Sequence, residues 1–215
     1  IGIAAHLLGR PIVVHDSDTR PGLANRIVAR WAKSIATGSP TENYGYPAAI
    51  TRYVGVPIGQ DFTPLSLREQ RSAKNDLGVI DLEAPLVVVT GGGLGSKSIN
   101  EAMVRSAEYI VGHGLHVYHV TGKRNYDEVR AAVKDDPHYQ LTPFVYKDMA
   151  KVLGAADVVV SRASATFLQE LAGLAKPAII IPSENLTDQI KNAATYDRAG
   201  AVKVLSDKDI SAGAT

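Results

Sequence analysis

The sequence contains no cysteine among its 215 residues. This absence excludes disulfide bonds and thiolate metal sites, and it is consistent with a reducing compartment. Apolar runs are short, and none approaches the roughly 18–20 residues that cross a bilayer. Lys and Arg number 23 against 22 for Asp and Glu, so the net charge of +1 offers no general argument for binding nucleic acid. With 45% hydrophobic residues, the chain can still form one large core or two smaller ones.

The sequence begins with IGIAAHLLGRPIVVHD, which has neither an initiator Met nor the charged leader and cleavage site of a signal peptide. Its first apolar positions are typical of the last turns of a helix. The last residues, SDKDISAGAT, come where another helix is expected to start. We therefore expect this sequence to be a piece of a longer protein.

Short β-branched runs alternate with helical patterns from Pro85 onward. The patterns predict strands at 86–90, 116–121, 140–145, 157–161, 177–182 and 201–205, and helices at 97–111, 125–134, 148–155, 165–175 and 187–199. This alternation is typical of an α/β fold in which helices cover both faces of a parallel sheet. The sequence therefore predicts a doubly wound C-terminal unit.

A smaller α/β unit is predicted before this block. It has a strand at 11–15, a loop at 16–22 and a helix near 23–36. The stretch that follows is rich in turn residues and predicts only a short helix, at 66–77. We therefore divide the chain into an N-terminal unit at 1–54, a linker at 55–82 and a C-terminal unit at 83–215.

A glycine turn follows the first strand of the larger unit, in the segment LVVVTGGGLGSKSINEA at 86–102. It is not a P-loop, because Ser96 separates Gly95 from Lys97, and the spacing G-x-G-x-x-G of dinucleotide-binding proteins fails as well. Glycines let the backbone pass close to a ligand, and amides at the start of the next helix can face a diphosphate. A tight turn without any ligand is the alternative that the sequence leaves open.

Two further segments place polar residues at the same predicted edge of the sheet. In DVVVSRASATFLQELAGLAKPAIIIP, Arg162 and Ser164 follow a strand, and Glu170 lies in the next helix one turn after Thr166. Glu170 can accept sugar hydroxyls or can simply favour the helix N-terminus through its charge. In ENLTDQIKNAA, Thr187 is the expected N-cap of a helix, and Asp188 and Gln189 lie in its first turn, where capping is the simpler explanation of these polar residues.

Four motifs in this order resemble the MurG family of glycosyltransferases. GRPIVVHDSDTRPGLANRIVARWAKSIA is similar to the family's strand, its His-Glu-Gln-Asn-type loop and the helix that follows. VVVTGGGLGSKSINEA resembles its G-G-S-x-G-A-x-x-x-N turn, and FVYKDMAKVLGAADVVVSRASATFLQELAGLAKPAIIIP and DQIKNAATYDRAGAV resemble its donor-binding half. The resemblance implies the GT-B fold, with two Rossmann-like domains, parallel sheets and the active site in the cleft. Residues 83–215 then correspond to the UDP-sugar-binding domain, truncated at its C-terminal end, and residues 1–54 to the remnant of an incomplete acceptor-binding domain.

The resemblance also implies a UDP-N-acetylglucosamine (UDP-GlcNAc) site. Its residues are Asp18, Gly92, Gly93, Gly95, Tyr146, Met149, Arg162, Ala165, Thr166, Phe167, Leu168, Gln169, Glu170 and Gln189. By this comparison Glu170 binds the ribose hydroxyls, Gln189 contacts the sugar, Tyr146 packs on uracil and the glycines line the diphosphate. The resemblance implies no metal and no cofactor. It assigns no catalytic residue to this chain, because the family's proposed histidine base belongs to a G-G-T-G-G-H loop that the sequence lacks.

Several positions depart from the family pattern. Gly93 and Leu94 replace Ser and Gln, which leaves backbone amides as the donors of the turn. Asp18 replaces Asn, and Gly59 stands where the family has an Arg that neutralises phosphate. Losing a cation and gaining an anion weakens a diphosphate site unless another cation compensates. Lys97 and Arg162 are the candidates for compensation.

The function implied by the resemblance is that of an inverting hexosyltransferase. It moves N-acetylglucosamine from UDP-GlcNAc to lipid I, a lipid-linked muramyl-peptide, to form lipid II in peptidoglycan synthesis. It acts without nucleic acid, as a peripheral protein on the cytoplasmic face of the bacterial inner membrane, and we expect the 215 residues alone to be inactive. Three alternatives remain: another GT-B transferase, the donor-binding subunit of a split transferase, or a UDP-sugar 2-epimerase, whose Asp-Ser-Gly-Gly signature is replaced here by SRASA.

Overall fold

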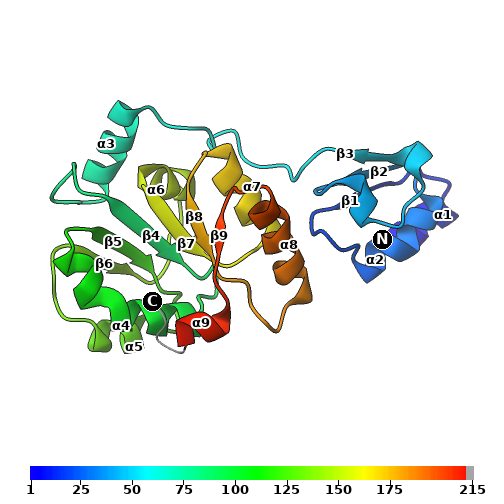
Figure 1. Cartoon of the computed structure of the whole chain (residues 1–215). Helices are drawn as coiled ribbons and strands as arrows, with labels where there is room; N and C mark the ends of the chain where they lie inside the picture. The colour runs from blue at the N-terminus through cyan, green and yellow to red at the C-terminus, as the bar shows by residue number, and fades with distance from the viewer. Residues whose placement is uncertain (212–215) are drawn as a thin grey trace.

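The computed structural model describes residues 1–211 and shows two bodies, each built on a parallel sheet (Figure 1). The smaller body contains α1 (Gly2–Leu7), β1 (Val13–Asp16), α2 (Leu23–Val28), β2 (Ser34–Thr37) and β3 (Thr51–Tyr53), with single 3₁₀ turns at Ala29–Trp31, Thr41–Asn43 and Ala48–Ile50. Its three strands lie in the order β1-β2-β3. Among the described residues, no helix is long and apolar enough to cross a membrane.

The larger body is a doubly wound α/β unit, as the sequence predicts. Its elements are α3 (Leu67–Asp76), β4 (Leu86–Thr90), α4 (Lys97–Gly112), β5 (His116–Val120), α5 (Tyr126–Ala132), β6 (Tyr139–Thr142), α6 (Met149–Ala155), β7 (Val158–Ser161), α7 (Ala165–Gly173), β8 (Ala178–Ile180), α8 (Thr187–Arg198), β9 (Lys203–Val204) and α9 (Asp207–Ser211). The strands are all parallel, in the order β6-β5-β4-β7-β8-β9. This is the strand order of dinucleotide-binding Rossmann sheets.

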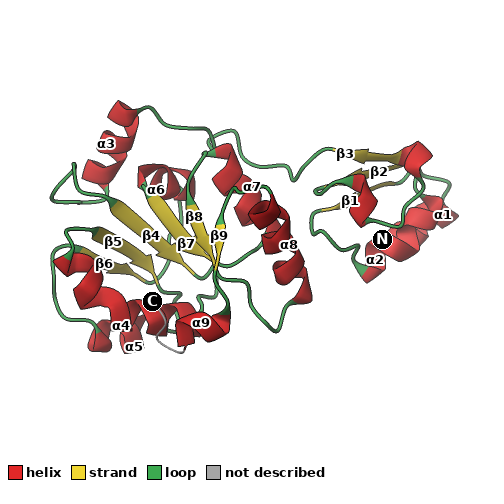
Figure 2. Cartoon of the chain, viewed as in Figure 1, coloured by secondary structure: helices red, strands yellow, loops and turns green. Residues whose placement is uncertain are grey.

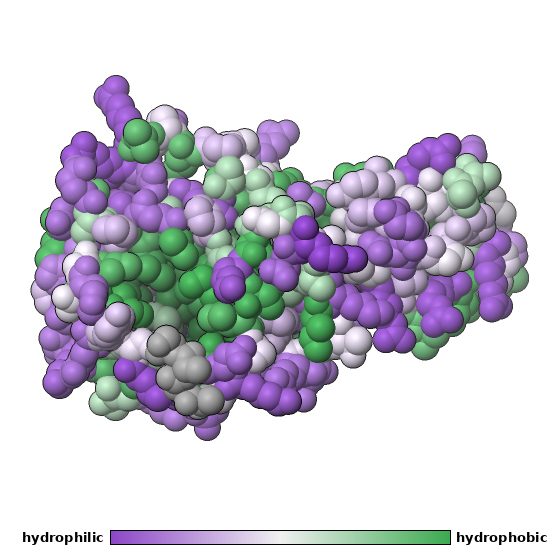
Figure 3. Space-filling model, viewed as in Figure 1, coloured by the Kyte–Doolittle hydropathy of each residue, from purple (hydrophilic) through white to green (hydrophobic). Residues whose placement is uncertain are grey.

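Adjacent residues of the central strands point to opposite faces of the sheet. Val88 of β4 is fully buried in one core, with residues of α3, α6, α7 and α8. Val89, the next residue, is fully buried in a second core, with residues of α4, α5 and α9. Figure 2 shows these helices around the sheet, and Figure 3 shows apolar side chains gathered over the strands in the same view. The near-continuous apolar run of β4 is therefore the pattern of a strand buried on both faces.

The predicted helix at 23–36 is wrong in its second half. The helix ends at Val28, one 3₁₀ turn follows, and Ser34–Thr37 then form β2. The backbone leaves the helical region at Ala32, where ψ is 135°. In β2 the fully buried Ile35 packs in the small core, while Ser34 and Ala36 are only half-buried. Pairing with β1 and β3 on both sides thus outweighs the helix propensity of this alanine-rich stretch.

Candidate functional site

A large opening lies where the strand order of the larger sheet reverses. β4 and β7 are neighbours there, and the chain turns away from them in opposite directions. The opening is a cavity of about 840 Å³ at the carboxyl ends of these strands. It is lined by Thr90, residues 91–96, Lys97, Ser98, Ser161, Arg162, Ser164, Thr166, Phe167, Glu170, Ser183, Asn185, Leu186, Gln189 and Asp207. Open α/β sheets bind ligands at this kind of switch point.

The glycine turn forms one wall of the cavity, and its backbone geometry requires glycine at several positions. Gly95 has a φ of +78°, and a Cβ there would lie 2.2 Å from the carbonyl oxygen of Thr121. Gly92 has a φ of +82°, and the space beside it is open. The hydroxyl of Ser96 then caps α4 by accepting a hydrogen bond from the amide of Ile99. The turn therefore places backbone that carries no side chains, together with the N-terminus of a 16-residue helix, at the cavity.

Helix α7 forms the opposite wall and presents Glu170. The carboxyl group is half-buried, and burial raises the pKa of Glu170, to which the nearby negative charge of Asp61 adds. Thr166 and Phe167 line the same cavity from the preceding turn. A carboxylate in this position can accept hydrogen bonds from two adjacent hydroxyl groups of a ligand.

The other predicted residues of α7 point elsewhere. Ala165 and Gln169 line a second cavity of about 300 Å³, between α7, α8 and the smaller body. The Gln169 side-chain oxygen accepts a long hydrogen bond from the amide of Val56, at 3.5 Å. Leu168 is buried in the core of the sheet. Helical periodicity thus distributes five consecutive candidates, 165–169, over three sides of one helix.

Gln189 lies in the first turn of α8 and lines the main cavity. Its side-chain oxygen accepts a hydrogen bond from the amide of Ser183, at 3.1 Å. The expected cap at Thr187 is not formed, because the structure gives Leu186 as the N-cap, with no side-chain hydrogen bond. The hydrogen bond from Ser183 occupies the side-chain oxygen of Gln189, so the NH₂ group of the side chain is the part that can donate to a ligand.

Arg162 lines the cavity but is held by protein partners. One guanidinium nitrogen donates to the Asp207 carboxylate at 2.9 Å and to the carbonyl oxygen of Ile181 at 3.0 Å. The other donates to the Ser98 hydroxyl at 2.7 Å, and Ser98 donates in turn to Asp207. The charge of Arg162 is therefore already neutralised. This ion pair is one that the sequence did not indicate, because Asp207 lies 45 positions along the chain.

Tyr146 and Met149 lie beside the cavity rather than in its wall. The Tyr146 side chain is 74% exposed, and the ammonium of Lys123 lies 4.6 Å from the centre of its ring and 5.2 Å from that of Phe144. Phe144 also lies 3.9 Å from the position of a Cβ on Gly93, so this cluster borders the glycine turn. Met149 begins α6 and packs against the core. The sequence did not indicate either residue as part of a site, although Lys123 follows the predicted strand 116–121 and Phe144 lies near the end of the predicted strand 140–145.

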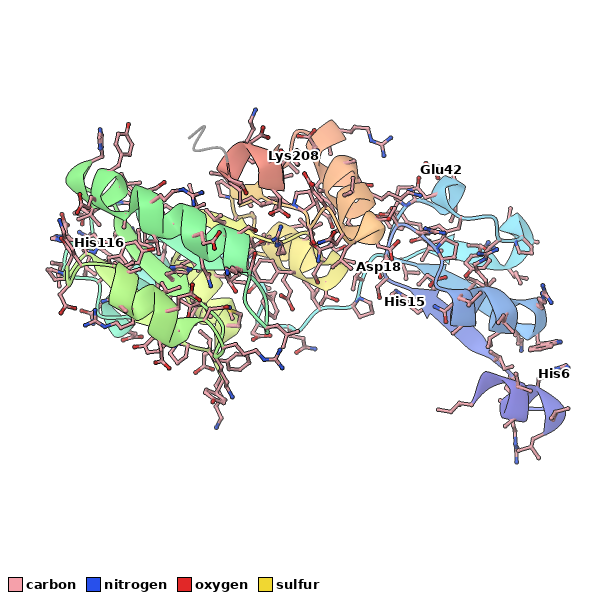
Figure 4. All side chains as sticks on the ribbon, turned by 90° about the horizontal axis from the view of Figure 1, so that it is seen from below. His6, His15, Asp18, Glu42, His116 and Lys208 are labelled. Atoms are coloured by element: carbon pink, nitrogen blue, oxygen red, sulfur yellow. The ribbon has the colours of Figure 1, made fainter. Side chains whose placement is uncertain are left out.

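Asp18 lies where the smaller body meets α8 (Figure 4). Its carboxylate accepts a hydrogen bond from the Asn192 side chain at 2.9 Å, and its carbonyl oxygen accepts one from the Tyr44 hydroxyl. Asn192 also accepts hydrogen bonds from the amide and hydroxyl of Thr19. His15, labelled nearby in Figure 4, contacts the Gly55 carbonyl through its ring. Asp18 therefore joins the two bodies and does not line the 840 Å³ cavity.

No group of three or more His, Asp or Glu side chains is placed to hold a metal ion within residues 1–211. The polar groups of the cavity are instead backbone amides, hydroxyls, the two amide side chains of Asn185 and Gln189, and two positive and two negative side chains. Such a set suits an anionic ligand that also carries hydroxyl groups.

Comparisons with known proteins identify the family and related folds. The family model of the glycosyltransferase family 28 C-terminal domain matches residues 86–214. A protein of Bacillus cereus is 34% identical over 215 residues, and one of Gloeobacter violaceus is 34% identical over 214. Both bear the name UDP-N-acetylglucosamine--N-acetylmuramyl-(pentapeptide) pyrophosphoryl-undecaprenol N-acetylglucosamine transferase, the first with the number 1. The matches cover 97% and 98% of this chain, but the chain spans only 57% of the length of each relative.

Solved structures share the fold. The crystal structure of MurG from Acinetobacter baumannii matches 96% of this chain and 56% of that protein, with a TM-score of 0.73 and 25% sequence identity. The structure of MnaA from S. aureus with UDP matches 99% of this chain and 62% of that one, with a TM-score of 0.64. Its 15% identity supports a common fold only. The expected fold, of GT-B type with parallel Rossmann-like sheets, is confirmed; the boundaries of the units at 54 and 82 stay predictions.

Proposed function

This chain belongs to glycosyltransferase family 28, and on that premise we propose that it is the donor-binding part of an inverting N-acetylglucosaminyltransferase. The proposed donor is UDP-GlcNAc and the proposed acceptor a lipid-linked muramyl-pentapeptide, as the names of the two relatives suggest. The single observation that carries the proposal is that the glycine turn and Glu170 line one cavity at the switch point of the sheet. Backbone amides of the turn suit a diphosphate and the carboxylate of Glu170 suits the ribose hydroxyls, so one UDP-sugar can contact both walls of the cavity.

The proposed pose follows from the cavity wall. The diphosphate lies along Gly92, Gly93 and Gly95, with the ribose hydroxyls at Glu170. The sugar extends toward Gln189, whose NH₂ group is the available donor. Uracil extends past the turn toward Tyr146. Ligand contacts of the remaining predicted residues, Asp18, Met149, Arg162, Ala165, Thr166, Phe167, Leu168 and Gln169, stay predictions.

The proposed reaction is a single displacement at the anomeric carbon. The acceptor hydroxyl attacks from the face opposite to the diphosphate, the bond to the leaving oxygen breaks and UDP departs with the bonding electrons. Negative charge then grows on the diphosphate, where amides held by the turn stabilise it without reorganising. We assign to this chain the binding of the donor and the stabilisation of the leaving group, and no general base.

The test of the proposal is a comparison of UDP and uracil binding by calorimetry. Glu170→Ala removes two hydrogen bonds to a charged acceptor, each worth at most about 1.5–3 kcal/mol and less where water competes. We expect UDP affinity to fall by roughly tenfold to a hundredfold. Uracil, which lacks ribose, should bind both proteins equally. Glu42→Ala is the matched control, because Glu42 is an exposed glutamate on the smaller body. Unchanged UDP affinity in Glu170→Ala would refute the assignment of the ribose.

A lipid-linked acceptor also requires the enzyme to reach a membrane surface, which we propose it does as a peripheral protein on the inner face. The segment around α2 suits this role, because Ile27 and Trp31 are 39% and 37% exposed. Arg26, Arg30 and Lys33 lie on the same short segment and can contact anionic headgroups. Vesicle co-sedimentation tests this surface: changing the three cations to Gln should reduce binding to anionic vesicles.

The control for this experiment changes three exposed cations of the larger body, Arg124, Arg130 and Lys134, to Gln. Both triple variants have the same net charge, so a difference between them reports where the charges lie rather than how many there are. If the α2 variant sediments with anionic vesicles as well as the unaltered protein does, the segment has no docking role.

A further inference from the structure

The charges of the main cavity are unevenly available to a ligand. Four charged side chains line it: Lys97, Arg162, Glu170 and Asp207. Arg162 and Asp207 form an ion pair at 2.9 Å, with side chains 15% and 21% exposed. Both are further held by Ser98, so their charges cancel within the wall. Among the residues that line this cavity, Lys97 and Glu170 therefore carry the charges that a ligand can meet.

Lys97 is free to move toward a ligand. Its side chain is 70% exposed, and its nearest acidic atom is the Glu101 carboxylate oxygen at 3.8 Å. This distance is longer than a hydrogen bond, and an exposed ion pair at i,i+4 in a helix contributes little to stability. The ammonium group can thus leave Glu101 at little cost. Because Lys97 is the first residue of α4, its flexible side chain starts directly after the glycine turn.

The other exposed lysine beside the turn has a different environment. The ammonium of Lys123 lies over the rings of Phe144 and Tyr146, at 5.2 and 4.6 Å from their centres. Contact with the aromatic faces holds this cation outside the cavity wall. Lys123 is therefore placed to affect a flat ring bound there rather than a diphosphate in the cavity.

We propose that Lys97 neutralises the diphosphate of the bound nucleoside-diphosphate sugar; this inference rests on the proposed function of the cavity. Without Lys97, the wall would present only the carboxylate of Glu170 to a ligand that is itself an anion. An ammonium group donates up to three hydrogen bonds and binds phosphate oxygens as a compact point charge. The same contact opposes the charge that grows on UDP as it leaves, so Lys97 also favours departure of UDP.

The experiment measures the affinity of UDP and of uridine, which lacks the phosphates, at low and at physiological ionic strength. Lys97→Gln should weaken UDP binding by about three- to tenfold, because part of the contact is exposed to solvent. It should leave uridine binding unchanged and reduce the dependence of UDP affinity on salt. Lys97→Arg should retain the affinity for UDP. Lys134→Gln is the matched control, since Lys134 is an exposed lysine that pairs with Glu108 away from the cavity.

The outcomes separate this inference from the proposed function. If the unaltered chain binds UDP and Lys97→Gln binds it equally well, the role of Lys97 is refuted and the nucleotide site stands. An equal loss of UDP and uridine affinity in Lys97→Gln also refutes it, because the effect then does not depend on the phosphates. If the unaltered chain binds no UDP at all, the proposed function fails, and the role of Lys97 fails with it.

Discussion

His119, a buried residue of β5, should make the stability of this protein depend on pH in the acidic range. Its side chain is fully buried, and its two ring nitrogens lie 3.0 Å from the Asn100 side-chain oxygen and 3.0 Å from the Tyr139 hydroxyl. Asn100 donates its NH₂ group to the Thr121 carbonyl, so its oxygen faces His119 and accepts from Nε2. Nδ1 then accepts from Tyr139. The neutral ring is fully satisfied, and burial lowers the pKa of His119 to about 4.

The sign and size of the effect follow from proton linkage. An unfolded histidine has a pKa of about 6.5, so the unfolded chain takes up the proton first as the pH falls. The stabilisation is complete above about pH 6.5 and is lost progressively as the pH falls to about 4, the pKa of folded His119. The difference between the two pKa values contributes about 3 kcal/mol to the free energy of unfolding at neutral pH, and about 2 kcal/mol of this contribution is lost by pH 5. Burial, and then the neighbouring His138, also lower the pKa of His116, which acts in the same direction.

The assay is urea unfolding followed by circular dichroism at pH 7.5 and pH 5, on the unaltered chain and His119→Gln. Gln keeps a donor toward Asn100 but cannot titrate, so the variant should be less stable at pH 7.5 yet lose about 2 kcal/mol less on acidification. His113→Gln is the control, because His113 is an exposed histidine. Its loss on acidification should stay close to that of the unaltered chain. Equal losses for the unaltered chain and His119→Gln would refute the reasoning.

Three other substitutions have outcomes that the structure fixes. Gly95→Ala should lower the free energy of unfolding by at least about 2 kcal/mol and weaken UDP binding, because φ is +78° and the new methyl group would clash with the Thr121 carbonyl. Unfolding curves that match those of the unaltered chain would contradict this. Asn192→Ala removes the side chain that accepts two hydrogen bonds from Thr19, so proteolysis at 16–22 should accelerate while α8 persists. Uridine affinity should fall as the pH drops through the raised pKa of Glu170, because only the carboxylate accepts from both hydroxyls, and Glu170→Gln should be insensitive to pH in that range.

The larger body could be predicted because each of its elements has a local cause. β4 is an apolar run that ends at a glycine turn, and α4 begins after a serine cap. The smaller body was harder, because the sequence does not separate the end of α2 from the start of β2. Ser34–Thr37 carry no turn signal before them, so they read as the end of a helix. Only the partners β1 and β3, which lie on either side of β2, decide that this segment is extended.

The separate segments of the candidate site could be predicted from the sequence, but the contacts between them could not. The glycine turn, Glu170 and Gln189 lie on separate loops and helices, and parallel topology brings their elements to one edge. The sequence did not reveal which side of α7 each residue of 165–169 occupies with respect to the cavity. Nor did it reveal that Asp18 bonds Asn192, because this contact joins residues 174 positions apart. A single sequence does not indicate which distant residues will pair with a charged side chain in the folded structure.

The pairing of Arg162 shows why a cationic residue at a binding edge need not be a ligand contact. Its guanidinium joins β7 to the Ser98 hydroxyl of α4 and to Asp207 of α9, and its side chain is only 15% exposed. Removing Asp207 would leave this charge largely buried and unpaired, which costs about 3–5 kcal/mol for buried pairs and less where solvent reaches. The first turn of α4, which follows the glycine turn, is thus held by the contact between Ser98 and Asp207 of α9. Arg162 therefore helps to hold the wall of the cavity, while the exposed Lys97 in the first turn of α4 remains available to the diphosphate of the proposed donor.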